Sequence, residues 1–280
     1  MAGVRIVTDS SSDIDEAVAA EHGIEVVPLT IRFGADELED RTELSPAEFY
    51  RRMAGSPDLP ETAAPAPGKF EAAFRRQAEA GADAVVCIDI SSDLSATMQS
   101  ARNAARALEG TLDVRVVDSR SITTGLGTQV LRAARAAADG ASADEVVALV
   151  EGLVARTRVF GALDTLDNLK KGGRIGGAQA LLGSLLSIKP ILDLSDGTVR
   201  EAGKARTRRK ALEALRDRVF AEPVLDEVCL AHGLAPDADE MLELLSPRVG
   251  PDQVRVATIG PVIATHGGPR VMGVTWLAGP

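Results

Sequence analysis

Three short apolar runs in the first half of the chain each end in a turn of aspartate and serine. The runs span 4–8, 84–90 and 114–117, and the turns that follow begin at Asp9, Ser91 and Asp118. Apolar residues then recur at helical spacing, as the run after Ser91 illustrates. This alternation predicts buried strands of one parallel sheet, joined by helices. Because the carboxyl ends of parallel strands meet at one edge, the three turns are expected to form a polar rim where a ligand binds.

The turn at 91–95 is a candidate anion site. It leads from a strand into a helix, where free backbone N–H groups and the positive end of the helix dipole favour negative charge. Ser95 and Thr97 would add hydroxyl donors, and Ala96 lies between them. Ordinary helix capping also explains serine and aspartate at such a position. These residues alone leave both interpretations open.

Two capping boxes and a proline-rich stretch divide the same half of the chain. Ser45 to Glu48 and Ser142 to Glu145 each place glutamate three residues after a capping serine, which predicts two helix starts. The stretch 56–70 holds four prolines and predicts a rigid loop. That loop either presents Thr62 to a site or serves as a connector. Residues 34–44 are acidic and are expected to be irregular.

The second half has a different pattern, with strands, hairpins and helices interspersed. Strands are expected at 191–194, 228–232, 254–259 and 271–277. Asp196-Gly197 is a hairpin signal that leads to a strand through Val199, and an apolar helix is expected over 178–187. We predict an α/β protein of two domains. Residues 1–157 form an α/β domain around the parallel sheet, and residues 158–280 form an α+β domain with a mixed sheet.

Composition argues against several classes of function. The net charge of -10 disfavours binding to nucleic acid or to an anionic membrane, and the 3% of aromatic residues leaves few platforms for stacking bases. Cys87 and Cys229 lie in apolar runs, which indicates buried thiols in a reducing compartment. No run has the length of a membrane span or of a signal peptide core, so a soluble, cytoplasmic protein is expected. His22, His232 and His266 share no metal-ligand spacing, so no metal site is expected.

Motifs for other chemistry are weak. The glycines of 172–177 follow a basic helix end instead of a strand, which is not the context of a nucleotide-binding loop. A serine hydrolase would need a base for one of the rim serines, and His266, in a turn between two strand-like runs, is the only candidate. The basic segment 204–210 is expected to begin a helix, either as a solvated helix start or as a docking surface for a protein partner.

Seven blocks of sequence have the order and spacing of one known family. They are 7–14 (VTDSSSDI), the Thr62 loop, 91–101 (SSDLSATMQSA), 116–127 (VVDSRSITTGLG), 164–175 (DTLDNLKKGGRI), 187–192 (SIKPIL) and 265–269 (THGGP). Together they resemble the DegV family of bacterial fatty-acid-binding proteins, the carrier subunits of fatty acid kinase. The resemblance runs from about residue 4 to residue 277.

The resemblance implies two domains that enclose one long-chain fatty acid, with its carboxylate hydrogen-bonded near their interface. Thr62, Ser95 and His266 match the residues that hold the carboxylate, with Thr97 and Ala96 as additional candidates. Arg206 falls in the segment associated with partner docking. A separate ATP-dependent kinase subunit would phosphorylate the bound acid, giving an acyl phosphate for phospholipid synthesis. The chain itself would then have no catalytic residue and no cofactor.

Three short motifs depart from the family pattern. The loop T-S-x-P-S reads TAAPA from Thr62, which replaces two hydroxyls, the first at Ala63. The S-G-T motif has Ala96 in place of glycine, and the H-T-G-P-G turn ends in Arg270. A head-group site with fewer donors is expected. Two rival functions remain at this point: a serine/histidine hydrolase of an ester or phosphate, and a regulatory interaction module centred on 204–210.

Overall fold

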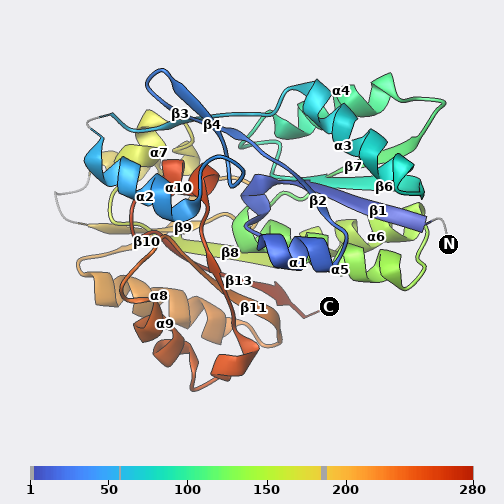
Figure 1. The fold of residues 1–280 in the computed structure, drawn as a ribbon. Helices are drawn as coiled ribbons and strands as arrows, with labels where there is room; N and C mark the ends of the chain where they lie inside the picture. Colours follow the sequence, from blue (N-terminus) through green and yellow to red (C-terminus); the bar gives the residue numbers. More distant parts are fainter. Residues whose placement is uncertain (1–2, 57, 184–187, 280) are drawn as a thin grey trace.

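The computed structural model describes residues 3–56, 58–183 and 188–279 and has an α/β architecture (Figure 1). Its first sheet is parallel, as predicted, with the strand order β2-β1-β6-β7. The strands are β1 (Gly3–Asp9), β2 (Glu25–Val27), β6 (Ala82–Asp89) and β7 (Asp113–Asp118). Both faces of this sheet are covered, which explains why its central strands are apolar at consecutive positions.

Four helices cover the two faces of the parallel sheet (Figure 1). α3 (Pro67–Glu79) and α4 (Thr97–Ala107) lie on one face, where Phe70 and Phe74 pack against Val85 and Cys87 of β6. α5 (Thr123–Ala138) and α6 (Ala143–Val154) lie on the other face. The short α1 (Glu16–Glu21) packs beside β2. The capping box at Ser142 is complete, which confirms the predicted start of α6.

The second sheet is mixed, as predicted, and has the order β10-β9-β8-β13-β11-β12. Its strands are β8 (Thr157–Ala162), β9 (Lys189–Asp193), β10 (Arg200–Ala205), β11 (Leu225–His232), β12 (Arg255–Thr258) and β13 (Met272–Ala278). Only β11 and β12 pair in parallel. α8 (Arg208–Ala221) and α9 (Ala238–Leu245) cover one face (Figure 1). Since the parallel sheet ends before β8 begins, we propose the domain boundary at 157/158.

α5 contacts both sheets. It packs against β1 and β6 of the first sheet and against β8, β11 and β13 of the second. A Cβ atom on Gly127 would lie 2.6 Å from the Ser12 carbonyl oxygen, and one on Gly125 would lie 2.8 Å from Cγ2 of Val159. These two glycines therefore allow α5 to approach a neighbour on each side, which is the close backbone approach that glycines inside a helix usually mark.

A third, small sheet corrects two predictions. Its order is β4-β3-β5, formed by β3 (Thr30–Phe33), β4 (Asp36–Glu39) and β5 (Glu61–Ala63). The acidic stretch expected to be irregular thus contains β4, and the proline-rich loop contains β5. Both strands pair antiparallel with β3, and β5 is separated from it by a helix, so local composition could not reveal the pairing. That helix, α2 (Pro46–Gly55), begins at the predicted Ser45 cap.

The second half of the chain requires four corrections. The apolar helix expected over 178–187 is the 3₁₀ helix η2 (Gly176–Gly183), and residues 184–187 lie outside the described residues. η2 is tied to the hairpin by a bond from Gly177 N to the Val199 carbonyl, 2.8 Å, which gives a partner to an N–H that is free at a helix start. The strand expected through Val199 begins at Arg200.

The basic segment 204–210 begins in a strand instead of a helix, because its first two residues pair with β9 and α8 starts only after its Thr207 cap. His266 lies in the last turn of α10 (Pro261–Gly267), not in a loop. Two further 3₁₀ turns, η1 (Ser10–Ser12) and η3 (Pro251–Gln253), and the short helix α7 (Asp167–Lys171) complete the fold.

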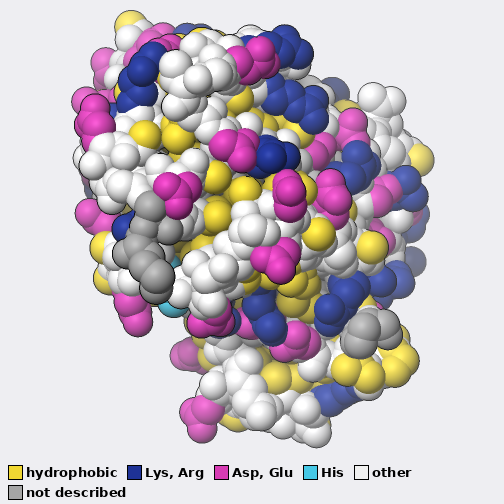
Figure 2. Space-filling view, turned by 90° about the vertical axis from the view of Figure 1, so that its right-hand side faces the viewer, with side chains coloured by type: hydrophobic (Ala, Val, Ile, Leu, Met, Phe, Trp, Pro, Cys, Tyr) yellow, Lys and Arg dark blue, Asp and Glu magenta, His cyan; other side chains and the backbone are white. Residues whose placement is uncertain are grey.

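The net negative charge does not gather on the face drawn in Figure 2, where acidic and basic side chains are intermixed. Among the described residues, no helix is both long enough and apolar enough to cross a membrane.

Candidate functional site

The polar rim lies at the carboxyl ends of the parallel strands and is hydrogen-bonded within itself. Asp9 Oδ2 accepts from the Ile90 N–H at 2.7 Å, and Asp118 Oδ1 accepts from the Ser92 N–H at 3.3 Å. Burial raises the pKa of Asp9 in spite of these donors. The rim carboxylates therefore tie adjacent strand ends together and do not point at a ligand.

Asp13 connects the rim to the helix that carries His266. Its buried carboxylate accepts from the Thr123 hydroxyl at 2.6 Å, from Arg41 Nη2 at 2.7 Å and from the Gly260 N–H at 2.9 Å. Gly260 is the N-cap residue of α10. Burial raises the pKa of Asp13, and the charge of Arg41 opposes that effect. This carboxylate fixes the start of α10, the helix that carries His266, beside η1 at the carboxyl edge of the first sheet.

An apolar cavity lies between the two sheets and α10. Its walls are mainly aliphatic side chains from both halves of the chain: Leu29, Ile90, Leu94, Ile122, Val159, Leu163, Leu169, Leu192, Leu194, Val199, Ile259, Val262, Ile263 and Val271. Five polar side chains also line it: Thr62, Ser95, Thr123, Arg174 and His266. A cavity of this composition suits an aliphatic ligand with one polar end.

Thr62 and His266 meet in this cavity although they are 204 residues apart. Thr62 Oγ1 lies 2.9 Å from His266 Nε2. β5 positions Thr62 by pairing it with Ile31 of β3, and the last turn of α10 positions His266. Burial lowers the pKa of His266 to about 4, with the charge of Arg174 as the second cause, so the imidazole is neutral at neutral pH. Its Nδ1 has no hydrogen-bond partner among the described residues.

Ser95 lies in the same cavity, in the turn before α4. Its hydroxyl is 2.8 Å from the Thr97 hydroxyl and accepts from the Thr97 N–H at 3.3 Å. The N-cap residue of α4 is Ala96, which has no side-chain cap bond, so Ser95 lies just before the cap and accepts only from the first helical N–H. One of the two hydroxyls retains a proton to donate elsewhere. Thr97 is buried, whereas Ala96 is exposed and lines no part of the cavity.

Arg174 is a site residue that the sequence analysis did not select. Its Nε donates to the Leu94 carbonyl at 3.2 Å, which ties the chain after α7 to the turn that holds Ser95. A second, polar cavity, lined also by Glu61 and Lys171, shares Thr62, Arg174 and His266 with the apolar one. The Thr62–His266 pair thus stands between an apolar and a polar space. In the sequence, the basic end of the block at 164–175 was the signal that could have identified Arg174.

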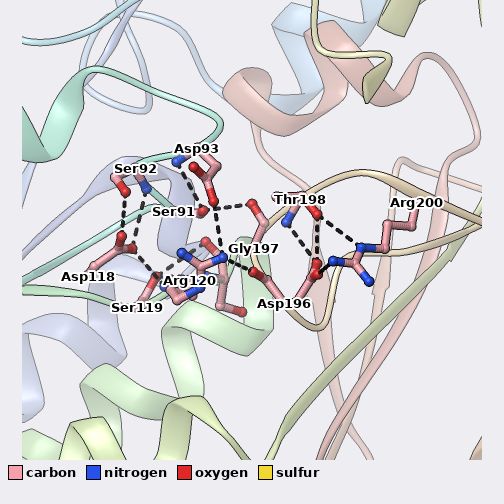
Figure 3. A network of polar contacts seen from close by, with 11 residues as sticks. Ser91, Ser92, Asp93, Asp118, Ser119, Arg120, Asp196, Gly197, Thr198 and Arg200 are labelled. Carbon is pink, nitrogen blue, oxygen red and sulfur yellow. Dashed lines mark hydrogen bonds and ion pairs between the residues drawn. The ribbon is translucent and has the colours of Figure 1, made fainter. Parts of the chain in front are cut away.

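A polar clasp joins the rim to the β9–β10 hairpin (Figure 3). The Ser91 hydroxyl donates to the Gly197 carbonyl at 2.7 Å, and Arg120 Nη2 binds both the Asp196 carbonyl and Asp93 Oδ2. Gly197 has φ +83°, and a Cβ atom on it would lie 2.6 Å from the Ser91 hydroxyl. The hairpin turn therefore contacts the rim directly and lies beside the wall of the apolar cavity.

The remaining predicted positions lie away from the cavity. Arg206 is exposed and follows the edge strand β10, with no ion pair or hydrogen bond among the described residues. Arg270 has φ +59°, a conformation that explains the family's glycine there, and its side chain lies 3.6 Å from Asp237 and 3.7 Å from Asp164. Ala63 pairs with Thr30 in the small sheet.

The geometry does not assemble the chemistry of a serine hydrolase. Among the described residues, the hydrogen-bond partner of His266 is a threonine, and no serine hydroxyl bonds to its ring. Its Nδ1 also lacks the carboxylate that orients the base of a catalytic triad. No group of three or more potential metal ligands occurs within the described part of the chain.

Comparisons with known proteins give a consistent result. The model of a family described as uncharacterised proteins of the DegV family matches residues 3–279. A DegV domain-containing protein of Streptomyces coelicolor is 39% identical over 277 residues, which cover 97% of each chain.

Solved structures agree. A DegV family protein from Thermus thermophilus, described for its fatty acid binding, has a TM-score of 0.91 and 34% identity over 99% of both chains. DegV from Bacillus subtilis, described as a fatty acid binding protein, has a TM-score of 0.86 and 28% identity over 100% of both chains.

Proposed function

The chain belongs to the DegV family, and we propose that it binds a long-chain fatty acid in the apolar cavity. One observation carries this proposal: an aliphatic cavity that closes on the hydroxyls of Ser95 and Thr62 beside a neutral His266. The acyl chain lies among the aliphatic walls, and its carboxylate lies at the polar end. The fatty acid binding of the Thermus and Bacillus relatives supports the assignment.

The two parts of the ligand contribute differently to binding. Burial of each methylene gains roughly 0.8 kcal/mol, so a long chain gains on the order of 10 kcal/mol before the costs of association. A carboxylate buried without donors would cost several kcal/mol. The tail therefore sets the affinity, while the hydroxyls and Arg174 make burial of the head tolerable and fix its position.

The Thr62–His266 pair has a preferred proton arrangement in this complex. A threonine hydroxyl has a single proton, so Thr62 donates to the carboxylate only if His266 Nε2 donates to Thr62. A neutral imidazole protonated on Nε2 meets this need, and burial lowers the pKa of His266 to about 4 in the protein without a bound acid. In this arrangement His266 orients the Thr62 hydroxyl towards the carboxylate.

Extraction of the purified protein tests this function. Denaturation and mass spectrometry of the extract should reveal a long-chain fatty acid, and Ser95→Ala should weaken the binding of added acid while leaving the fold intact. Ser92→Ala is a matched control, because Ser92 is exposed and bonds only to the rim aspartate Asp118. A protein that carries no fatty acid and binds none when it is added would refute the proposal.

We further propose that the chain is a non-catalytic carrier that presents the carboxylate to a separate ATP-dependent kinase subunit. The polar cavity beside the Thr62–His266 pair offers a route to the head group, and the exposed Arg206 offers an unpaired charge for docking. The buried free cysteines fit a cytoplasmic carrier, since that compartment is reducing.

Arg206→Ala tests the docking role. With ATP and the kinase subunit, this variant should form acyl phosphate at a rate at least about ten-fold lower, a size within reach of one charged contact at an interface. Its affinity for the fatty acid should be unchanged. Arg209→Ala, in the same basic segment but paired with Glu213 and Glu240, is the control and should keep its rate. An undiminished rate in Arg206→Ala would contradict the docking role.

A further inference from the structure

Two glycines lie opposite each other at the centre of the six-stranded sheet. Gly161 of β8 is the direct Cα partner of Gly273 of β13, and these are the two central strands. A glycine inside a strand weakens it and usually marks a bulge, or a place where another backbone or a ligand comes close. The two strands pair without a register shift, and neither glycine has the positive φ that other residues avoid. Backbone conformation therefore does not require glycine at either position.

Crowding by neighbouring protein atoms does not require glycine at these two positions either. A Cβ atom on Gly161 would meet nothing nearer than the Met272 carbonyl oxygen at 3.6 Å. On Gly273 the nearest atom would be the Phe160 carbonyl oxygen at 3.5 Å, which is also an ordinary contact. Gly127 differs, since its Cβ would lie 2.6 Å from a carbonyl oxygen. There is thus room for a Cβ atom at both of the first two glycines without a steric clash.

That room belongs to the apolar cavity, because both glycines line it. Side chains alternate along a strand, so Gly161 shares its face of β8 with Val159 and, just past the strand end, with Leu163. Both of these also line the cavity, and Gly161 is the low point between them. A side chain at this position would therefore enter the cavity between Val159 and Leu163.

We propose that Gly161 and Gly273 determine the length of the acyl chain that the cavity admits. The methylenes cross the sheet over the bare backbone of this pair and continue past it, so long linear chains are bound and side chains here would exclude them. This inference rests on the proposed function and adds to it the residues that set the acyl length. The family resemblance alone leaves the acyl length undetermined.

Substitution of each glycine tests the proposal with two linear saturated acids, octadecanoic and dodecanoic acid. Gly161→Val and Gly273→Val should each lower the affinity for octadecanoic acid by about ten-fold or more, which corresponds to about two methylenes denied burial. Their affinity for dodecanoic acid should change by less than about three-fold. Gly161→Ala should show the same preference to a smaller degree, and it serves if a valine variant does not fold.

Gly3→Val is the matched control. Gly3 is a strand glycine of β1 with open space around its Cβ position and no part in the cavity, so both affinities should be unchanged. Equal losses for the two acids, or unchanged affinity for octadecanoic acid in folded Gly161 variants, would overturn the proposal. A wild-type protein that binds neither acid would instead refute the proposed function, which keeps the two failures distinguishable.

Discussion

Asp40 shows how burial in this fold makes a single carboxyl group respond to pH. It follows β4, is 1% exposed, and donates its backbone N–H to the Leu29 carbonyl at 2.9 Å. Burial raises the pKa of Asp40 to about 7, against the lowering influence of the Ser10 hydroxyl and the Arg41 charge. At a pH below the usual pKa of an aspartate, the Asp40 carboxyl group is protonated in both the folded and the unfolded chain. Between about pH 4 and pH 7 the unfolded chain releases this proton first, so the free energy of unfolding falls as pH rises.

Asp40→Asn should remove this contribution. The variant should show a smaller loss of stability between about pH 4 and pH 7, with a difference from the wild type of a few kcal/mol at most, as measured by urea denaturation. Asp36→Asn, at an exposed position in the preceding strand β4, should reproduce the wild-type slope. Asp9, Asp13 and Asp89 also have raised pKa values, so some slope will remain. A slope in Asp40→Asn as steep as the wild type's would contradict the assignment.

At the scale of helices and strands, predictions from the sequence succeeded where the signal was local. The Ser45 and Ser142 caps each placed a helix start, because a capping side chain bonds to backbone three residues away. The parallel sheet followed from apolar runs that are buried on both faces. β5 was missed, because its reason to be extended is its pairing with β3 about thirty residues earlier in the chain.

The residues of the candidate site show the same difference between local signals and contacts made only in the fold. The resemblance to a family selected Thr62, Ser95 and His266, and the structure places all three in one cavity. Spacing alone could not have brought Thr62 to His266, since their contact depends on β5 and α10 meeting across the fold. The helix of His266 did have a local signal: Gly260-Pro261 is a typical helix start with proline at the first position. Arg174 and the Gly161–Gly273 pair became visible only once the cavity was assembled from both sheets.

At the scale of the whole molecule, the apolar cavity is lined by residues of both sheets, and we expect a long ligand to enter where the two sheets separate locally. The clasp of Figure 3 is a polar contact next to the cavity wall. Leu194 and Val199, on either side of the hairpin turn, line the cavity, as does Leu94 of the rim turn. Arg120 holds the turn from the rim side, with φ +46° and its N–H donated to Asp118 Oδ1 at 2.9 Å. If the cavity binds a fatty acid as proposed, release of this hairpin is the smallest movement that opens it.

Arg120→Met should therefore speed the exchange of bound fatty acid more than it weakens binding. Its contacts with Asp93 and with the Asp196 carbonyl are partly exposed, and their loss is worth about 1 kcal/mol, or roughly a three- to ten-fold faster dissociation. Displacement of a fluorescent fatty acid in a stopped-flow instrument measures that rate.

Arg115→Met is the matched control, because among the described residues Arg115 pairs with Asp113 and Asp144 on the outer surface. The entry rate should rise with the exit rate, since the clasp bars both directions, so the dissociation constant should change less than either rate. Rates equal to those of the wild type would show that the ligand enters elsewhere and that the clasp only joins the two sheets.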